Sequence, residues 1–212
     1  MKPRQQRLME TLLPQIAVRV QQADLEPAAL FDNAQEIWLE VGFGGGEHLA
    51  EQAAQNPNVG IIGAEPFING VAKLLIEIEE RNLNNIRILH GDVRPFLMRL
   101  PSGCITRLFV LYPDPWPKKR HHKRRIINPW FLDEAARVLK PGGELRVASD
   151  IADYQRWTLM HICSRPEFFW TAEAAPDWRK RPSDWPRTRY EAKADVAGRV
   201  SAYLRFTRTD LT

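Results

Sequence analysis

The chain has 212 residues, of which 44% are hydrophobic and 26% charged, a composition typical of one globular domain and not of a disordered tail. No apolar run approaches the roughly 20 residues that a membrane span requires. The two cysteines are too few for a disulfide framework or a zinc cage. The five histidines lack metal-ligand spacing. We therefore expect no membrane association and no metal. The basic N-terminus lacks the continuous apolar segment of a secretory signal, so a cytoplasmic location is expected.

Residues 1–35 are predicted to form a basic amphipathic N-terminal arm, followed by one domain over residues 36–212. Apolar residues of the arm recur at helical spacing, and its arginines fall nearer the polar face. The apolar positions are Leu8, Leu12, Leu13, Ile16 and Val20, and the arginines are Arg4, Arg7 and Arg19.

From residue 36 on, short apolar runs alternate with longer helical patterns, which is typical of a parallel sheet flanked by helices. Strands are predicted at 37–41, 59–65, 86–90, 105–112, 143–149, 168–171 and 200–208, and helices at 46–55, 67–82, 93–100, 127–139 and 152–164. This order predicts an α/β fold with a mostly parallel seven-stranded sheet and helices on both faces. An insertion rich in Pro, Trp and Arg, at about 174–190, either contacts RNA or packs on the domain by its tryptophans.

A glycine-rich segment, Glu40-Val41-Gly42-Phe43-Gly44-Gly45-Gly46, follows the first predicted strand. A dinucleotide fingerprint would require a further glycine at position 47 or 49, which Glu47 and Leu49 occupy. The carboxylate beside Gly42, Gly44 and Gly46 instead suits an adenosine ligand that carries a cation and no phosphate. S-adenosylmethionine has these properties.

Acidic residues also end the next two predicted strands. Glu65 is placed to accept hydrogen bonds from ribose hydroxyls, and Asp92 to meet an adenine amino group. The alternative is structural, because Glu40 and Asp92 are also suited to capping helices. Three acids at three consecutive strand ends favour the ligand site.

The segment Tyr112-Pro113-Asp114-Pro115-Trp116-Pro117 follows the most apolar strand, and its prolines hold Asp114 stiffly at the same sheet edge. Trp116 offers a face for stacking a base, or is an aromatic core residue. Six positive charges follow between Lys118 and Arg125, although the net charge is only +4. Such a focused patch favours a polyanion partner over a merely solvated loop.

These motifs resemble those of the bacterial tRNA (guanine-N7-)-methyltransferase family. The resemblance runs from about Glu40 to the C-terminus and rests on EVGFGGG, GAEPF, HGDV, LYPDPWPKKRHHKRRI, SDI at Ser149 and TRYEAK at Thr188. It implies a Rossmann-like methyltransferase fold, S-adenosylmethionine as the cofactor, and methylation of guanine N7 in the variable loop of tRNA. The oligomeric state is left open between monomer and homodimer.

The resemblance also implies roles for individual residues. It assigns Asp114 to catalysis, and Glu40, Gly42, Gly44, Gly46, Glu65, Asp92 and Asp114 to the cofactor. It assigns Lys118, Asp150, Thr188, Arg189, Tyr190 and Glu191 to the guanosine, and Arg120, His121, His122, Lys123, Arg124 and Arg125 to the rest of the RNA.

Guanine N7 has a free lone pair and no proton, so its methylation requires orientation and electrostatics instead of a general base. Asp114, Asp150 and Glu191 are candidates for holding the guanine N1–H and amino group, with Asp150 alternatively an N-cap of the helix near Ile151. Two other functions remain open. One is an amino-group methyltransferase acting on adenine or cytosine, and the other is a non-catalytic RNA-binding module.

Overall fold

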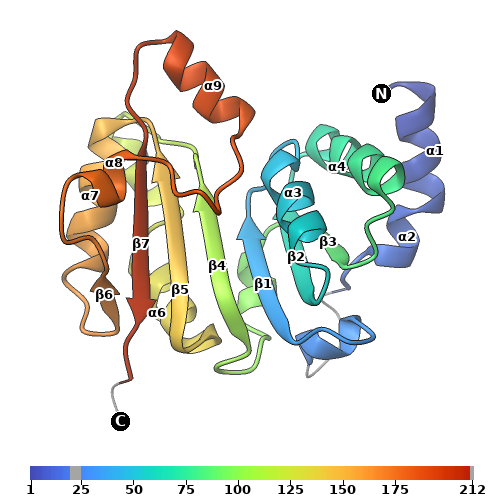
Figure 1. The fold of residues 1–212 in the computed structure, drawn as a ribbon, viewed down its shortest axis with the longest axis horizontal. Coiled ribbons are helices and arrows are strands. Elements are labelled where there is room, and N and C mark those ends of the chain that lie inside the picture. The colour runs from blue at the N-terminus through green and yellow to red at the C-terminus, as the bar shows by residue number, and fades with distance from the viewer. Residues whose placement is uncertain (20–24, 211–212) are drawn as a thin grey trace.

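The computed structural model describes residues 1–19 and 25–210, so Val20 of the predicted arm lies outside the described residues. Seven strands form one sheet in the order β3-β2-β1-β4-β5-β7-β6 (Figure 1). Strands β1 to β5 pair in parallel, and β7 is antiparallel to β5 and β6. The predicted α/β class and mostly parallel sheet are therefore confirmed. The strands are β1 (Glu36–Val41), β2 (Val59–Glu65), β3 (Ile86–His90), β4 (Ile105–Leu111), β5 (Leu139–Ser149), β6 (Phe168–Trp170) and β7 (Ala202–Arg208).

The helices agree with most predicted positions. They are α1 (Pro3–Thr11), α2 (Leu13–Ile16), η1 (Pro27–Leu30), α3 (Glu47–Gln55), α4 (Ile68–Arg81), α5 (Arg94–Leu97), η2 (Lys119–Arg124), α6 (Pro129–Val138), α7 (Ala152–Ile162), α8 (Pro176–Arg179) and α9 (Arg189–Val196). Sequence analysis did not predict α9, although its start carries a recognisable signal. Thr188 is the N-cap and its Oγ1 accepts a hydrogen bond from the Glu191 backbone N–H at 3.2 Å, in a Thr-x-x-Glu pattern typical of helix starts.

The alternation of side chains along the strands divides the core between the two sheet faces. In β1, Leu39 packs with the side of α5, α6 and α7, whereas Trp38 packs with the side of α3 and α4. From β1, the chain builds β2 and β3 on one side and then crosses to β4 and β5 on the other. The carboxyl ends of β1 and β4 thus adjoin where the strand order reverses, the place at which open α/β sheets bind ligands.

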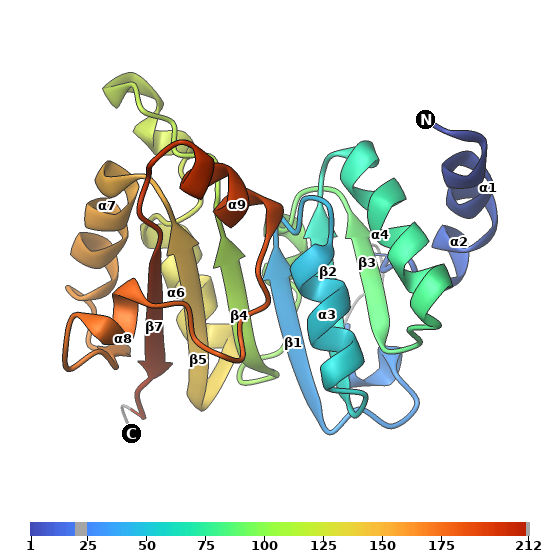
Figure 2. The ribbon, with the colours of Figure 1, turned by 45° about the horizontal axis from the view of Figure 1, so that its top comes forward.

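The predicted insertion at 174–190 covers the half of one sheet face that α3 and α4 leave uncovered. Figure 2 shows the segment between α8 and α9 crossing in front of β5 and β4. Trp185 on this segment is only 2% exposed and packs edge-on against Tyr203 of β7 at 5.7 Å. Asp184 forms an ion pair with the buried Arg146 of β5 at 2.7 Å. The structure therefore contains the tryptophan packing that was one alternative, and contact of this insertion with RNA stays a prediction.

The N-terminal arm lies at the opposite end of the molecule from β6, against α4 (Figure 1). Leu8 is 2% exposed in this contact. Arg4 and Arg7 both form ion pairs with Glu79 of α4, at 2.7 and 2.5 Å. Two of the basic residues of the arm are therefore already paired within the chain. Among the described residues, no helix has the length and apolar character needed to cross a bilayer.

If the insertion is part of the core, Trp185→Ala will lower the free energy of unfolding by about 3–5 kcal/mol, because it leaves a large cavity over the sheet. Urea unfolding followed by circular dichroism measures this change. Phe169→Ala is the control, since Phe169 on β6 is 64% exposed and its loss is expected to change stability by less than about 0.5 kcal/mol. Equal stability of the two variants would show that the insertion is not part of the core.

Candidate functional site

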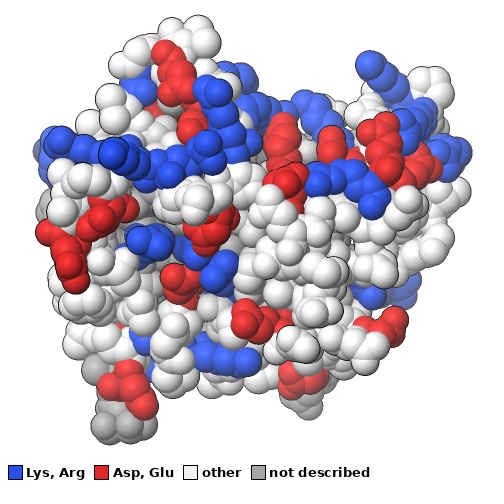
Figure 3. Space-filling view, viewed as in Figure 1, with Lys and Arg blue, Asp and Glu red and all other residues white. Residues whose placement is uncertain are grey.

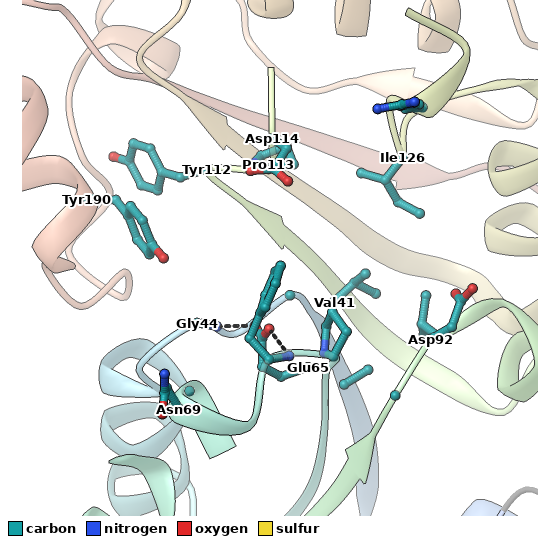
Figure 4. A pocket seen from close by; sticks show the side chains of 18 of the residues that line it. Val41, Gly44, Glu65, Asn69, Asp92, Tyr112, Pro113, Asp114, Ile126 and Tyr190 are labelled. Carbon is teal, nitrogen blue, oxygen red and sulfur yellow. Dashed lines mark hydrogen bonds between the residues drawn. The ribbon is translucent and has the colours of Figure 1, made fainter. Parts of the chain in front are cut away.

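A cavity of about 630 Å³ opens at the carboxyl ends of β1 to β4 (Figure 4). Five segments line it: the glycine-rich turn after β1, the ends of β2 and β3 with the start of α4, the proline-rich loop after β4, the end of η2 with Ile126, and the start of α9. Its size is within the range of small-molecule sites, about 300–1,000 Å³. The lining residues that enter the argument are Val41, Gly42, Gly44, Glu65, Phe67, Asn69, Gly70, Lys73, Asp92, Arg94, Tyr112, Asp114, Trp116, Arg124, Arg189 and Tyr190.

The turn after β1 requires glycine for two separate reasons. Gly42, Gly44 and Gly46 have φ values of 72°, 59° and 83°, a region that favours glycine. Gly42 and Gly44 line the cavity, whereas Gly46 begins α3 and packs beneath Leu74. A Cβ on Gly70 of α4 would lie 2.2 Å from the Gly44 carbonyl oxygen, so the turn and α4 are in direct backbone contact.

Glu65 joins this turn to the end of β2. Its Oε2 accepts a hydrogen bond from the Gly44 N–H at 2.7 Å, and its Oε1 accepts one from the Phe67 N–H at 2.9 Å (Figure 4). Burial raises the pKa of the Glu65 carboxyl above its ordinary value. Each oxygen keeps a further lone pair, and Glu65 lines the cavity. Glu65 can therefore accept a hydrogen bond from a ligand hydroxyl, which is the role that the sequence predicted for it.

The other two strand-end acids have partners of their own. Glu40 is 3% exposed and its carboxylate lies 2.7 Å from Nδ1 of His48 on α3, and it is not among the residues that line the cavity. Asp92 does line the cavity and accepts a hydrogen bond from the Arg94 N–H at 3.0 Å. The hydrogen bond from the Arg94 side chain lowers the pKa of Asp92. Asp92 therefore faces the cavity but is not the N-cap of α5, because Val93 occupies that position, and Glu40 pairs with α3 and does not line the cavity.

The loop after β4 is held in an uncommon conformation. Tyr112 and Trp116 have φ values of 49° and 42°, which for residues other than glycine costs about 1–3 kcal/mol each. Between them, Asp114 is exposed at the cavity and forms no hydrogen bond or ion pair with residues that the structure describes. Trp116 also lines the cavity, with the Arg124 guanidinium 4.8 Å from its ring centroid. The structure thus presents an unpaired carboxylate beside an aromatic face.

The start of α9 forms the wall opposite the proline-rich loop. Tyr190 stacks on Tyr112, with ring centroids 6.1 Å apart and an interplanar angle of 18° (Figure 4). Arg189 lines the cavity beside it, and Thr188 is buried as the N-cap of α9. The cavity therefore lies between the carboxyl ends of β1 to β4 and the start of α9.

Two predicted guanine-binding acids do not line the cavity in this structure. Glu191 is 9% exposed and pairs with Arg181 at 3.1 Å. Asp150 pairs with Arg199 at 2.6 Å. Asp150 is not the N-cap of α7 either, because Ile151 occupies that position without a side-chain cap.

The basic run forms η2, which projects above the carboxyl ends of the strands as the yellow-green segment of Figure 2. Lysine and arginine side chains form a band across the upper part of the face in Figure 3. Within the run, His121 and His122 are half-buried beside Trp116 and Trp157. The exposed members are Lys118, Lys119, Arg120, Lys123 and Arg124.

Arg125 departs from the prediction that it contacts RNA. Its side chain is 1% exposed and pairs with Asp153 of α7 at 2.5 Å. The sequence places it in a charge run, but the turn at the end of η2 points its guanidinium inward. In this structure Arg125 cannot reach a bound RNA.

Sequence analysis did not single out Phe67, which lines the cavity directly after Glu65 and is 71% exposed. Asn69, Lys73 and Arg94 also line the cavity and were not among the predicted site residues. An aromatic residue so exposed beside a ligand-sized cavity is suited to stacking on a planar ring. The signal was present in the motif GAEPF, where an aromatic follows a strand-end acid by two positions.

Comparison with known proteins identifies the family. A family model described as "Putative methyltransferase" matches residues 34–203. The tRNA (guanine-N(7)-)-methyltransferase of Rhodospirillum rubrum is 54% identical over 96% of this chain and 82% of its own, and that of Caulobacter vibrioides is 48% identical over 98% and 90%. The chain belongs to the tRNA (guanine-N(7)-)-methyltransferase family. This confirms the family predicted from the sequence and makes S-adenosylmethionine the methyl donor.

Solved structures support the fold assignment. The 16S rRNA methyltransferase KamB superposes with a TM-score of 0.61 over 84% of this chain and 90% of its own, at 18% identity. The predicted methyltransferase fold is thereby confirmed. Among the described residues, no group of three or more His, Cys, Asp or Glu is arranged to hold a metal ion.

The contact between Gly70 and the glycine turn provides a test of the donor site. Gly70→Ala places a methyl group against the Gly44 carbonyl, and the overpacking of about 1–3 kcal/mol must displace the turn. We expect the Kd for S-adenosylmethionine, measured by calorimetry, to rise about 10–100-fold.

Gly103→Ala is the control for this test. Unlike Gly70, Gly103 has a positive φ of 65°, which disfavours alanine, but no atom lies within 4 Å of its Cβ position. Gly103→Ala is expected to lower stability by about 1–2 kcal/mol and to leave donor affinity unchanged. Unchanged affinity in Gly70→Ala would contradict a donor site at this turn.

Proposed function

We propose that this protein transfers the methyl group of S-adenosylmethionine to N7 of a guanine in the variable loop of tRNA, giving 7-methylguanosine and S-adenosylhomocysteine. The observation that carries the proposal is the arrangement of one cavity: a glycine turn and the Glu65 carboxylate on one side, and Asp114 with Trp116 on the other. The exposed basic residues of η2 follow directly from that second side.

The donor side of the cavity fits S-adenosylmethionine. Gly42 and Gly44 allow the backbone to approach the ligand, Glu65 can accept ribose hydroxyls, and Phe67 offers a ring beside them. A side chain at Gly44 would fill this space, since its Cβ would lie 2.9 Å from the Tyr190 hydroxyl. The bound donor supplies an activated methyl group on a positively charged sulfur. In this proposal Asp92, which pairs with Arg94, meets the adenine amino group, and the unpaired Asp114 adds negative charge near the cation.

In this proposal the side of the cavity that carries Asp114 and Trp116 positions the guanine and stabilises the charge that develops on it. Because N7 carries a lone pair, the protein does not need to remove a proton from it. Asp114 is the one predicted acid that faces the cavity without a partner among the described residues. Its carboxylate can accept hydrogen bonds from the guanine N1–H and amino group and offset the positive charge that develops on the base. Adenine lacks these donors, so the same contact selects guanine.

In this proposal Asp150 and Glu191 reach the guanosine only after their ion pairs with Arg199 and Arg181 open. Both pairs are at least partly accessible to solvent, where such pairs contribute only about 0–1 kcal/mol. Binding of an anionic RNA near Arg199 and Arg181 would compete for the guanidinium groups. The roles of Lys118, Thr188, Arg189 and Tyr190 at the guanosine are part of the same proposal.

The exposed members of the basic run are proposed to contact phosphates of the tRNA outside the target nucleotide. From the tRNA substrate we infer that the reaction takes place in the cytoplasm. The oligomeric state, monomer or homodimer, remains a prediction without a test in the structure.

The direct test is incubation of the protein with unmodified tRNA and donor carrying a labelled methyl group, followed by mass analysis of the oligonucleotides from a partial digest and of the nucleosides from a complete one. Label in 7-methylguanosine from the variable loop is expected. Label in a methylated adenine or cytosine would instead support the amino-group methyltransferase, and donor binding without any product would support a non-catalytic RNA-binding module.

Asp114→Ala is expected to lower kcat by at least about 100-fold, because it removes the charge that stabilises the transition state. Single-turnover methylation of a tRNA transcript measures this, and circular dichroism checks the fold. Asp133→Ala is the control, since Asp133 lies on α6 with its side chain 63% exposed and is not part of the cavity. An active Asp114→Ala variant would remove Asp114 from the mechanism.

Replacing Lys119, Arg120 and Lys123 together by alanine is expected to raise the KM for tRNA and lower its salt slope by about 2–3, since each phosphate contact contributes about 1. KM is measured from 50 to about 200 mM salt. Lys140→Ala serves as the control, because Lys140 is exposed and lies at the start of β5, the end of the sheet away from the cavity and η2. An unchanged salt slope in the triple variant would mean that η2 is only solvated.

A further inference from the structure

The basic run contains one arginine whose environment differs from that of the others. Arg125 directly follows η2, and its side chain is 1% exposed, although Lys123 and Arg124 next to it are exposed. Its Nε donates a hydrogen bond to the carbonyl oxygen of Pro115 at 2.8 Å, and its terminal nitrogen donates to Asp153 of α7. A single guanidinium thus connects the loop after β4 to α7.

Aromatic rings hold this guanidinium in place. Its central carbon lies 4.9 Å from the ring centroid of Trp157 and 5.3 Å from that of Tyr154, both on α7. Its remaining terminal nitrogen is buried with no hydrogen-bond partner among the described residues. A buried charge is costly unless it is paired, and the ion pair with Asp153 offsets this cost although one donor is left unfilled. A surface role in binding RNA does not explain this arrangement.

The loop that Arg125 contacts has few hydrogen-bond donors of its own. Three of the six residues from Tyr112 to Pro117 are prolines, which lack an N–H. The loop also contains two residues with positive φ, Tyr112 and Trp116. Such a segment depends on contacts from elsewhere in the fold to stay in one conformation. The carbonyl that Arg125 binds belongs to Pro115, the residue next to Asp114.

We propose that Arg125 is a positioning residue, which fixes the Pro115 carbonyl against α7 and so sets where the Asp114 carboxylate lies in the cavity. Pro115 has a fixed φ, so anchoring its carbonyl restricts the preceding residue as well. An arginine suits this task because its planar fork donates to a carbonyl and a carboxylate at once, which a lysine ammonium does not reproduce. The inference rests on the proposed function, since it assigns the role through Asp114.

The test uses Arg125→Lys in the full chain, which keeps the positive charge and removes the fork. With saturating donor, we measure kcat, the KM for tRNA, its salt slope and the folded fraction at the assay temperature. We expect kcat to fall about 10–100-fold, because small misplacement of a positioned group has effects of this size. The KM for tRNA and the salt slope should stay within about twofold of wild type, because no phosphate contact is lost.

Three results would overturn the inference. A raised KM for tRNA with unchanged kcat would indicate an RNA contact, and a kcat loss that only matches the loss of folded protein would indicate a purely structural role. An unchanged kcat would indicate no role. If Arg125→Lys does not fold, Asp153→Asn decides the question, since it weakens the anchor and leaves Arg125 present: a several-fold lower kcat in folded protein supports the inference, and an unchanged kcat overturns it.

Arg156→Lys is the matched control. Arg156 lies 3.8 Å from the same Asp153 carboxylate, but its side chain is 70% exposed and it has no contact with the loop. The same substitution there should leave kcat unchanged. A wild-type protein that methylates no tRNA would contradict the proposed function together with this inference, whereas an active wild type beside an unimpaired Arg125→Lys variant would contradict the inference alone.

Discussion

The structure depends on the close backbone contact at the carboxyl ends of β1 and β2. The Gly44 N–H donates to Glu65 while the Gly44 carbonyl lies against Gly70 of α4, with no space for a Cβ. This contact fixes the glycine turn beside an acid with a raised pKa. Since β1 and β4 are neighbours in the sheet, the turn also adjoins the loop that carries Asp114. One backbone contact thereby sets the position of the glycine turn and Glu65 relative to the loop that carries Asp114.

The segment from Asp184 to Tyr190 links the core to the cavity. Trp185 and Asp184 pack on the face of β4, β5 and β7, while Arg189 and Tyr190, a few residues later, line the cavity. Gln52 of α3 donates to the Asp184 carbonyl at 2.7 Å, which ties the segment to the helix that begins at the glycine turn. This segment is therefore anchored to the core at one end and lines the cavity at the other.

Charged residues that look alike in sequence have three different environments. Arg4 and Arg7 are paired with Glu79 on the outside of α4, Lys119 and Arg120 face solvent on η2, and Arg125 is buried. Among the described residues, no ion pair holds Lys119 or Arg120, whereas the surface pairs of Arg4 and Arg7 must open before these arginines can bind phosphates. Counting basic residues locates a polyanion-binding region, but the direction of each side chain decides which of them contributes.

The sequence by itself determined the sheet, the family and most of the cavity lining, because strand periodicity, glycine spacing and strand-end acids are local patterns, and parallel strands bring their carboxyl ends to one edge. It did not determine that Glu40 would turn to His48, that Glu191 and Asp150 would pair with arginines, or that Arg125 would point inward. These outcomes depend on partners 8 to 49 residues away in the chain. Only the tertiary structure brings such residues together, since a side chain's partner is set by packing and not by its neighbours in sequence.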